Sequence, residues 1–234
     1  MISACWSVLL FFVATFIHLV SFADENSDPV IVINPAWESK YVSEGQNNLD
    51  SGGIFSFDIA AAWQHLYVGS WFAQGDSESY QELNLYVGYV YQFHAVETYL
   101  NFTHLRFPKD NEHDNEIAFG LAYLGMENLY PAVDYTWSSE ADGAFVEVSL
   151  NSQLHIENAP IVFTPYILQA FDFGYVTSDY DGPNNLQIGI VTTIGIKEHS
   201  QLNIELNHSW AQENLDREDL GDVTWVGIRL IWDM

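Results

Sequence analysis

The sequence predicts an all-β protein, a single antiparallel up-and-down transmembrane β-barrel of about twelve strands. Three observations lead to this fold class. From about Ile54 onward, strand-like stretches of roughly ten residues alternate apolar and polar side chains. The reversals between these stretches are alternately short and long, and one face of each stretch is apolar while the other is polar or tiny. This pattern is typical of a sheet that closes on itself across a bilayer, with short turns on one side and long loops on the other.

The reversals divide the chain in order. Short reversals are expected at Gln64-His65, His94-Ala95, Glu127-Asn128, Glu157-Asn158 and Glu198-His199-Ser200. Longer polar segments are expected at residues 46–53, 75–79, 109–115, 138–142, 177–185 and 212–222. With one strand before Gly45 and one after Gly221, the number of strands is about twelve. An even number places both ends of the chain on the short-turn side.

The first 23 residues predict a secretory signal peptide. Residues 2–23 carry no Asp, Glu, Lys or Arg, and they end in Ser21-Phe22-Ala23, which suits cleavage before Asp24. The missing basic residue is atypical, and an uncleaved membrane anchor is the alternative. Residues 24–234 are then one barrel domain without a linker. Cys5 is the only cysteine, so a mature chain has no disulfide, thiol nucleophile or thiolate metal site.

The charge is strongly acidic. All 32 Asp and Glu residues follow the predicted cleavage site, against six Lys and Arg residues. This balance excludes nucleic acid as a partner, because phosphates require clustered basic residues. The acidic charge favours cations as binding partners instead. Adaptation to a salty medium is the alternative explanation, since salt screens the repulsion between surface carboxylates.

Several strands alternate clearly enough to assign their faces. In 81–93, Leu85 and Val87 share one face while Glu82 and Asn84 share the other. A soluble sandwich or lipocalin with its apolar face inward shows the same alternation. The length of the stretches favours the membrane barrel, because ten to thirteen tilted residues cover about 25–30 Å, the height of the lipid-facing band. Glycine and alanine on the polar face suit a lumen filled by larger neighbours.

Aromatic residues predict two belts at the membrane interfaces. At the short-turn end these are Trp63, Tyr91, Phe93, Tyr123 and Trp232, and at the loop end they are Phe55, Trp71, Tyr135, Trp137 and Trp210. The last strand alternates up to the carboxyl-terminal Met234, which predicts recognition by the barrel-assembly machinery. A terminal Phe is more usual there.

Three segments carry a resemblance to a known family: 37–45 (WESKYVSEG) with Gly53 after it, 66–71 (LYVGSW) and 82–89 (ELNLYVGY). They resemble strands of porins of the TorF-like family. The family has an aromatic-x-x-basic/Gly strand, a Tyr-x-Gly-x-Trp strand and a Glu-Leu-x-Leu-Tyr-x-Gly-Tyr strand, and the similarity extends in looser form over nearly the whole mature chain. The resemblance implies a Gram-negative outer-membrane barrel, with channel activity as a candidate and no catalytic residues. The chain has Lys40-Tyr41 where the family commonly has Arg-Gly, so a shared substrate does not follow.

The polar face of the barrel supplies the candidate site. The residues expected to line a pore are Glu38, Lys40, Asp58, Glu82, Asn84, Asn101, Asp134, Glu147, Asn151, Glu205, Asn207 and Arg229. Glu205 and Arg229 lie about equally far from the short-turn ends of neighbouring strands, so we expect a cross-strand ion pair between them. The excess of carboxylates predicts a lumen that concentrates cations and repels anions.

The expected function is passive diffusion of ions or small hydrophilic solutes through the outer membrane, with a weak preference for cations and without a cofactor. The expected partners are outer-membrane lipid and lipopolysaccharide, besides the assembly machinery. The alternative is a closed barrel with a structural or adhesive role, because about twelve strands leave a narrow bore in which charges must be paired or solvated.

Two other activities were considered as hypotheses, and neither is predicted. Asn207-His208-Ser209 suggests serine chemistry, but consecutive strand residues point to opposite faces, so His208 cannot serve Ser209. The acidic segments 110–116 and 179–182 carry oxygen ligands suited to calcium or magnesium. Neither has the full calcium-loop pattern, so no metal site is predicted, and solvated acidic loops are expected. His65, His94 and His199 fall in predicted turns, where they cannot converge on a metal.

Overall fold

The structure is a computed structural model that describes residues 28–234. The predicted signal peptide, residues 1–23, lies outside the described residues. Within the described part of the chain, no helix is long and apolar enough to cross a bilayer.

Twelve antiparallel strands form a closed ring, as the sequence predicts. The strands of the ring are β1 (Val30–Glu38), β4 (Ile54–Trp63), β5 (Leu66–Gly75), β6 (Gln81–Phe93), β7 (Val96–Phe107), β8 (Glu112–Tyr123), β9 (Leu129–Ser138), β10 (Gly143–Ser152), β12 (Ile161–Phe173), β13 (Asp181–Lys197), β14 (Ser200–Ala211) and β15 (Val223–Asp233). Four short elements are not strands of the ring: β2 (Val42–Ser43) and β3 (Gln46–Asn47), which pair with each other, β11 (Leu154–His155), which pairs with β12, and the helix α2 (Glu213–Arg217).

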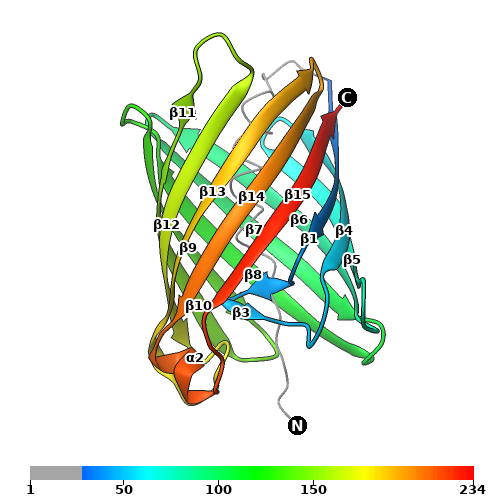
Figure 1. The fold of residues 1–234 in the computed structure, drawn as a ribbon, viewed down its shortest axis with the longest axis vertical. Coiled ribbons are helices and arrows are strands. Elements are labelled where there is room, and N and C mark those ends of the chain that lie inside the picture. The colour runs from blue at the N-terminus through cyan, green and yellow to red at the C-terminus, as the bar shows by residue number, and fades with distance from the viewer. Residues whose placement is uncertain (1–27) are drawn as a thin grey trace.

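The first and last strands close the barrel. In the ladder between β1 and β15, Ile33 lies opposite Trp232 and Trp37 opposite Ile228. Beyond the ladder, the backbone amide of Ile31 donates to the carbonyl of Met234 at 2.9 Å, and the amide of Met234 donates to the carbonyl of Ile31 at 2.9 Å. The carboxyl terminus and the start of β1 therefore lie together at one end of the barrel (Figure 1).

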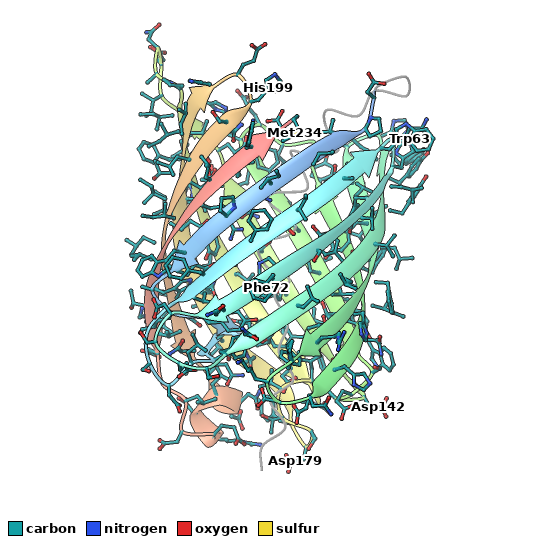
Figure 2. All side chains as sticks on the ribbon, turned by 90° about the vertical axis from the view of Figure 1, so that its right-hand side faces the viewer. Trp63, Phe72, Asp142, Asp179, His199 and Met234 are labelled. Atoms are coloured by element: carbon teal, nitrogen blue, oxygen red, sulfur yellow. The ribbon has the colours of Figure 1, made fainter. Side chains whose placement is uncertain are left out.

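The short turns and the long loops gather at opposite ends, as predicted. Figure 2 shows Trp63, His199 and Met234 at one end, and Asp142 and Asp179 at the other. We call these the turn end and the loop end. The short reversals include the residues expected, but three bounds differ. The reversals between β8 and β9 (124–128) and between β11 and β12 (156–160) are longer than predicted, and Ser200 is already the first residue of β14.

The two faces of the wall have the predicted orientation. Leu85 and Val148 point outward and are 47% and 48% exposed, whereas Glu82 and Glu147 point inward and are 0% and 6% exposed. This is the reverse of a soluble sandwich or lipocalin, whose apolar face is buried. The outer surface is an apolar band suited to lipid, and the polar side chains lie inside.

The predicted interface aromatics point outward with one exception. Trp63, Phe93 and Trp232 at the turn end and Tyr135 at the loop end are all exposed. The prediction for Trp71 was wrong, because it is 5% exposed and lies on the inner face of β5. Its outward neighbour is Phe72, which is 40% exposed. The strand alternation fixes this choice, since Trp71 has the same parity as the buried Tyr67.

Inward tyrosines lie over inward glycines of neighbouring strands. A Cβ atom on Gly88 would lie 2.2 Å from Cζ of Tyr67, and one on Gly69 would lie 2.2 Å from the hydroxyl of Tyr86. Gly120 under Tyr99 and Gly189 under Tyr166 repeat the arrangement. The tiny residues of the inner face therefore create the space that the tyrosine rings fill, as the sequence suggested.

This packing predicts that Gly88→Ala destabilises the barrel by about 1–3 kcal/mol, because the added methyl group clashes with the Tyr67 ring. Urea unfolding of the purified barrel, followed by heat-modifiable gel migration, measures the change. Gly221→Ala is the matched control, since no heavy atom lies within 4 Å of a Cβ built there. Equal stability of the two variants would contradict the packing argument.

Candidate functional site: the lumen

The predicted lining residues on strands all lie on the inner face. Buried inward residues among them are Asp58, Glu82, Asn84, Glu147, Glu205, Asn207 and Arg229. Half-buried inward residues among them are Glu38, Asn101, Asp134 and Asn151. Lys40 differs from these, because β1 ends at Glu38 and Lys40 belongs to the segment that leaves the wall.

Arg229 holds two carboxylates together at the seam of the barrel. Its Nε lies 3.8 Å from Glu205 Oε1 on β14, and its Nη2 lies 3.7 Å from Glu38 Oε1 on β1. Gly227 sits opposite Glu205 and leaves space for both carboxylates. The predicted pair between Glu205 and Arg229 is confirmed, and Glu38 extends it across the closure between the first and last strands. Arg229 is the only buried Lys or Arg within residues 28–234.

Tyrosine and asparagine side chains satisfy other inward carboxylates. Asp58 accepts hydrogen bonds from the Tyr86 hydroxyl at 2.7 Å and from Asn34 Nδ2 at 3.1 Å. Asp134 accepts a hydrogen bond from the Tyr99 hydroxyl at 2.7 Å. Each tyrosine stands two strands away from its carboxylate, so these contacts bridge the inner surface across an intervening strand. Neutral donors thus stabilise these two inward carboxylates.

A hairpin between β1 and β4 folds into the loop end of the lumen. It consists of β2, β3 and the turn at Glu44 and Gly45, whose φ angles are 46° and 78°. On one side, the Tyr41 hydroxyl donates to Glu82 Oε2 on β6 at 2.6 Å, and the Tyr41 ring lies 6.2 Å from that of Trp71. Burial and the Glu82 carboxylate raise the pKa of Tyr41 well above its usual value, so the hydroxyl keeps the proton that it donates.

The tip of the hairpin reaches the opposite wall. Gly45 packs so closely against Asn185 that a Cβ atom there would lie 2.3 Å from Asn185 Cγ. Asn184 Nδ2 donates to the carbonyl of Glu44 at 2.6 Å. Strands β6 and β13 are six steps apart in a ring of twelve, so the hairpin spans the whole diameter of the bore. Figure 1 shows β3 at the same end of the barrel as α2.

A second segment enters the lumen beside the hairpin. Tyr175, between β12 and β13, is 2% exposed, and its hydroxyl donates to Glu116 on β8. Asp172 fixes this turn by accepting hydrogen bonds from the backbone amides of Tyr175, Val176 and Thr177 at 2.8–2.9 Å. Asn214 of α2 donates to both Asp172 and Asn184. Buried amides therefore connect α2, the second segment and the hairpin into one closure of the loop end.

Four carboxylates lie at this closure. They belong to Glu44 of the hairpin and to Glu82, Glu116 and Glu147 of the wall, and each is at most 6% exposed. Glu44 repels both Glu116 and Glu147. Glu147 also faces Asp134 directly across the ladder between β10 and β9, and it accepts no hydrogen bond from a described side chain. This end of the lumen therefore gathers four acidic side chains with no buried Lys or Arg among the described residues beside them.

Sequence reasoning missed the hairpin, Tyr175 and the inward Trp71. The segment 46–53 was expected to be a loop, but it begins with β3 and returns from the far wall. One signal was present, since Glu44-Gly45 between polar residues suits a tight turn. No sequence signal specifies that the hairpin folds inward, because its contacts join residues far apart in the chain.

The two other candidate activities meet structural obstacles. Asn207 and Ser209 are buried inside, whereas His208 points outward to Thr224 Oγ1 at 2.7 Å and packs on Trp210. The expectation of a solvated loop at 110–116 was wrong in part, because residues 112–116 belong to β8 and Asp114 is buried. Asp114 accepts hydrogen bonds from Ser138, Ser139 and the backbone amide of Glu140, and so it joins β8 to the loop after β9. Within residues 28–234, no group of three or more acidic, His or Cys side chains has a geometry suited to a metal.

The comparisons with known proteins concern the fold. No protein-family model matches the chain, and no curated protein matches it in sequence. Solved structures that resemble it include the KdgM porin, with a TM-score of 0.61, 10% identity and coverage of 86% of this chain and 98% of that one. The NanC porin has a TM-score of 0.54 and 9% identity over 86% and 98% of the two chains. The COG4313 outer membrane channel from Pseudomonas putida F1 has a TM-score of 0.54 and 11% identity over 88% and 95%. The chain has the barrel fold of these outer-membrane proteins.

The seam cluster predicts that Arg229→Met destabilises the barrel by about 3–5 kcal/mol, because Glu38 and Glu205 are left without their cation. Adding Glu205→Gln should recover part of the loss. Urea unfolding measures both changes. Arg217→Met is the matched control, since its ion pair with Glu213 is exposed and should contribute less than about 0.5 kcal/mol. A loss no larger than that of the control would refute the role of Arg229.

Proposed function

We propose that the protein is a passive diffusion channel in the outer membrane of a Gram-negative bacterium. It passes ions or small hydrophilic solutes, favours cations weakly and uses no cofactor. The fold shared with the KdgM and NanC porins supports this proposal, and so does the resemblance of three strand segments to TorF-like porins. In this assignment the turn end faces the periplasm and the loop end faces the outside.

The observation that carries the proposal is the excess of carboxylates on the inner face. A barrel with a purely structural role is more stable with an apolar or fully paired interior, because unpaired buried charges are costly. Within residues 28–234, only one buried arginine faces many inward carboxylates. A path that admits water and cations would solvate these groups and would give them a use in selecting the solute.

The closure of the loop end supports a second candidate function, a non-conducting structural or adhesive barrel. The hairpin contacts both walls, and Tyr175 fills the space beside it. Displacement of the hairpin from this position would widen the path for conduction. Purified protein in planar lipid bilayers discriminates between the two functions. Stepwise conductance with a cation-biased reversal potential supports the channel, and silence at all voltages supports the closed barrel.

For the channel, we expect Glu147→Gln to lower the ratio of cation to anion permeability, because it removes an inward charge that no described side chain neutralises. The reversal potential in a salt gradient measures the ratio. Glu140→Gln is the control, because it removes an exposed carboxylate at the same end of the barrel. A selectivity that stays unchanged in Glu147→Gln would refute the place of Glu147 in the conducting path.

The hairpin gives a further prediction for the channel. Tyr41→Ala should raise the open probability, because it removes the hydrogen bond to Glu82 and the ring contact with Trp71 that hold the hairpin to β6. Single-channel recordings measure this probability. Tyr135→Ala removes an equally large ring from the outer face and should leave gating unchanged. Wild-type gating in Tyr41→Ala would show that the hairpin does not control the path.

A further inference from the structure

Basic side chains of this acidic protein gather on the outer face of β7 and β8. Of the six Lys and Arg residues in the sequence, Arg106 and Lys109 lie at the loop end of these two strands. His104 and His113 lie beside them, and Arg106, Lys109 and His113 are exposed. We call these four residues the outer basic patch.

The strand register brings the patch together. Arg106 lies directly opposite His113 in the ladder between β7 and β8, and His104 is two residues earlier on the same face. The rings of His104 and His113 are 6.1 Å apart, and His104 Nδ1 lies 2.9 Å from Asn115 Oδ1. The alternation of β8 turns its buried carboxylates, Asp114 and Glu116, to the inner face. The basic groups and the buried acidic groups of this strand pair therefore lie on opposite sides of the wall.

The cations of the patch have no carboxylate ion-pair partner within residues 28–234. Neither Arg106 nor Lys109 forms an ion pair with any residue that the structure describes. Asp110 and Glu112 lie in or beside the same turn, and both are exposed. Glu112 has the parity of the inner face and opposes Phe107. Arg106 thus remains available to an external anion.

The patch lies at the edge of the apolar outer band. Leu83 on β6 is opposite Arg106, and Leu85 is opposite His104. On the other side, Ile117 follows Asn115 on the outer face of β8 and is opposite Trp137 on β9. Apolar side chains therefore flank basic ones within the same few residues. A ligand that matches this order has acyl chains joined to an anionic head.

We propose that the outer basic patch binds the phosphorylated headgroup of an outer-leaflet lipid. The phosphate accepts charge-assisted hydrogen bonds from Arg106 and His113, and the acyl chains pack on Leu83, Leu85 and Ile117. Arginine suits this role because its fork of donors matches phosphate oxygens. The proposal rests on the outer-membrane placement with the loop end outside, and it is independent of whether the barrel conducts.

The test uses purified barrel in detergent, with native mass spectrometry as the readout. The probes are bisphosphorylated lipid A, the same lipid with both phosphates removed, and inorganic phosphate alone. We expect wild type to retain the phosphorylated lipid and to lose the dephosphorylated one. Arg106→Gln should weaken retention about tenfold, and Arg106→Lys should restore part of it. Heat-modifiable migration shows that each variant is folded.

Arg217→Gln is the matched control, since it removes one exposed cation from α2 at the same end of the barrel. It should retain lipid as wild type does. Equal retention by Arg106→Gln and wild type would overturn the proposal, and so would equal retention of the two lipids. If Arg106→Gln weakened the binding of inorganic phosphate as much as that of lipid A, the site would be one for free phosphate. That result would also overturn the proposal. Lipid retention is measured without ion flow, so a silent bilayer recording leaves this result unaffected.

Discussion

The two-residue alternation of the strands is the constraint on which the rest of the structure depends. Once the outer face must be largely apolar, most polar side chains of the wall are forced into a bore of only twelve strands. Large and small residues then have to interlock inside, which explains why Tyr67 and Tyr86 lie over Gly88 and Gly69. The tyrosine hydroxyls also provide donors for Asp58 and Asp134, so one residue type both fills space and satisfies charge.

Charge is distributed unequally within this interior. At the seam where β1 and β15 meet, Arg229 offsets the negative charges of Glu38 and Glu205. Without it, repulsion between these two carboxylates would weaken the closure of the ring. Among the described residues, the loop end has no such buried Lys or Arg and holds Glu44, Glu82, Glu116 and Glu147 instead. The same acidic excess that disfavours compact packing is the property that a cation path needs. The carboxylates that the proposed cation path needs therefore lower the stability of the barrel. The hairpin lies among these carboxylates at the loop end.

The sequence was sufficient for properties that depend on local periodicity. The strand number, the end at which each reversal lies and the orientation of Leu85 and Glu82 all follow from alternation and turn length, and the structure confirms them. The ion pair of Glu205 and Arg229 was also predictable, because it depends only on the register of neighbouring strands. Trp71 was misplaced because its aromatic character was given more weight than its parity. The inward hairpin was not predictable, since Tyr41 and Glu82 or Glu44 and Asn184 meet only after the ring has closed.

The seam between β1 and β15 also shows that the arrangement of the strands does not depend on where the backbone is interrupted. Ile31 and Met234 exchange two backbone hydrogen bonds, so the two ends of the barrel wall already meet as neighbouring strands do within a hairpin. A short peptide could join them without moving either strand. The break in the backbone could then be transferred to an exposed loop such as the one at Asp142, giving a circular permutant with the same wall. The order in which the strands are synthesised would change while their neighbours stayed the same.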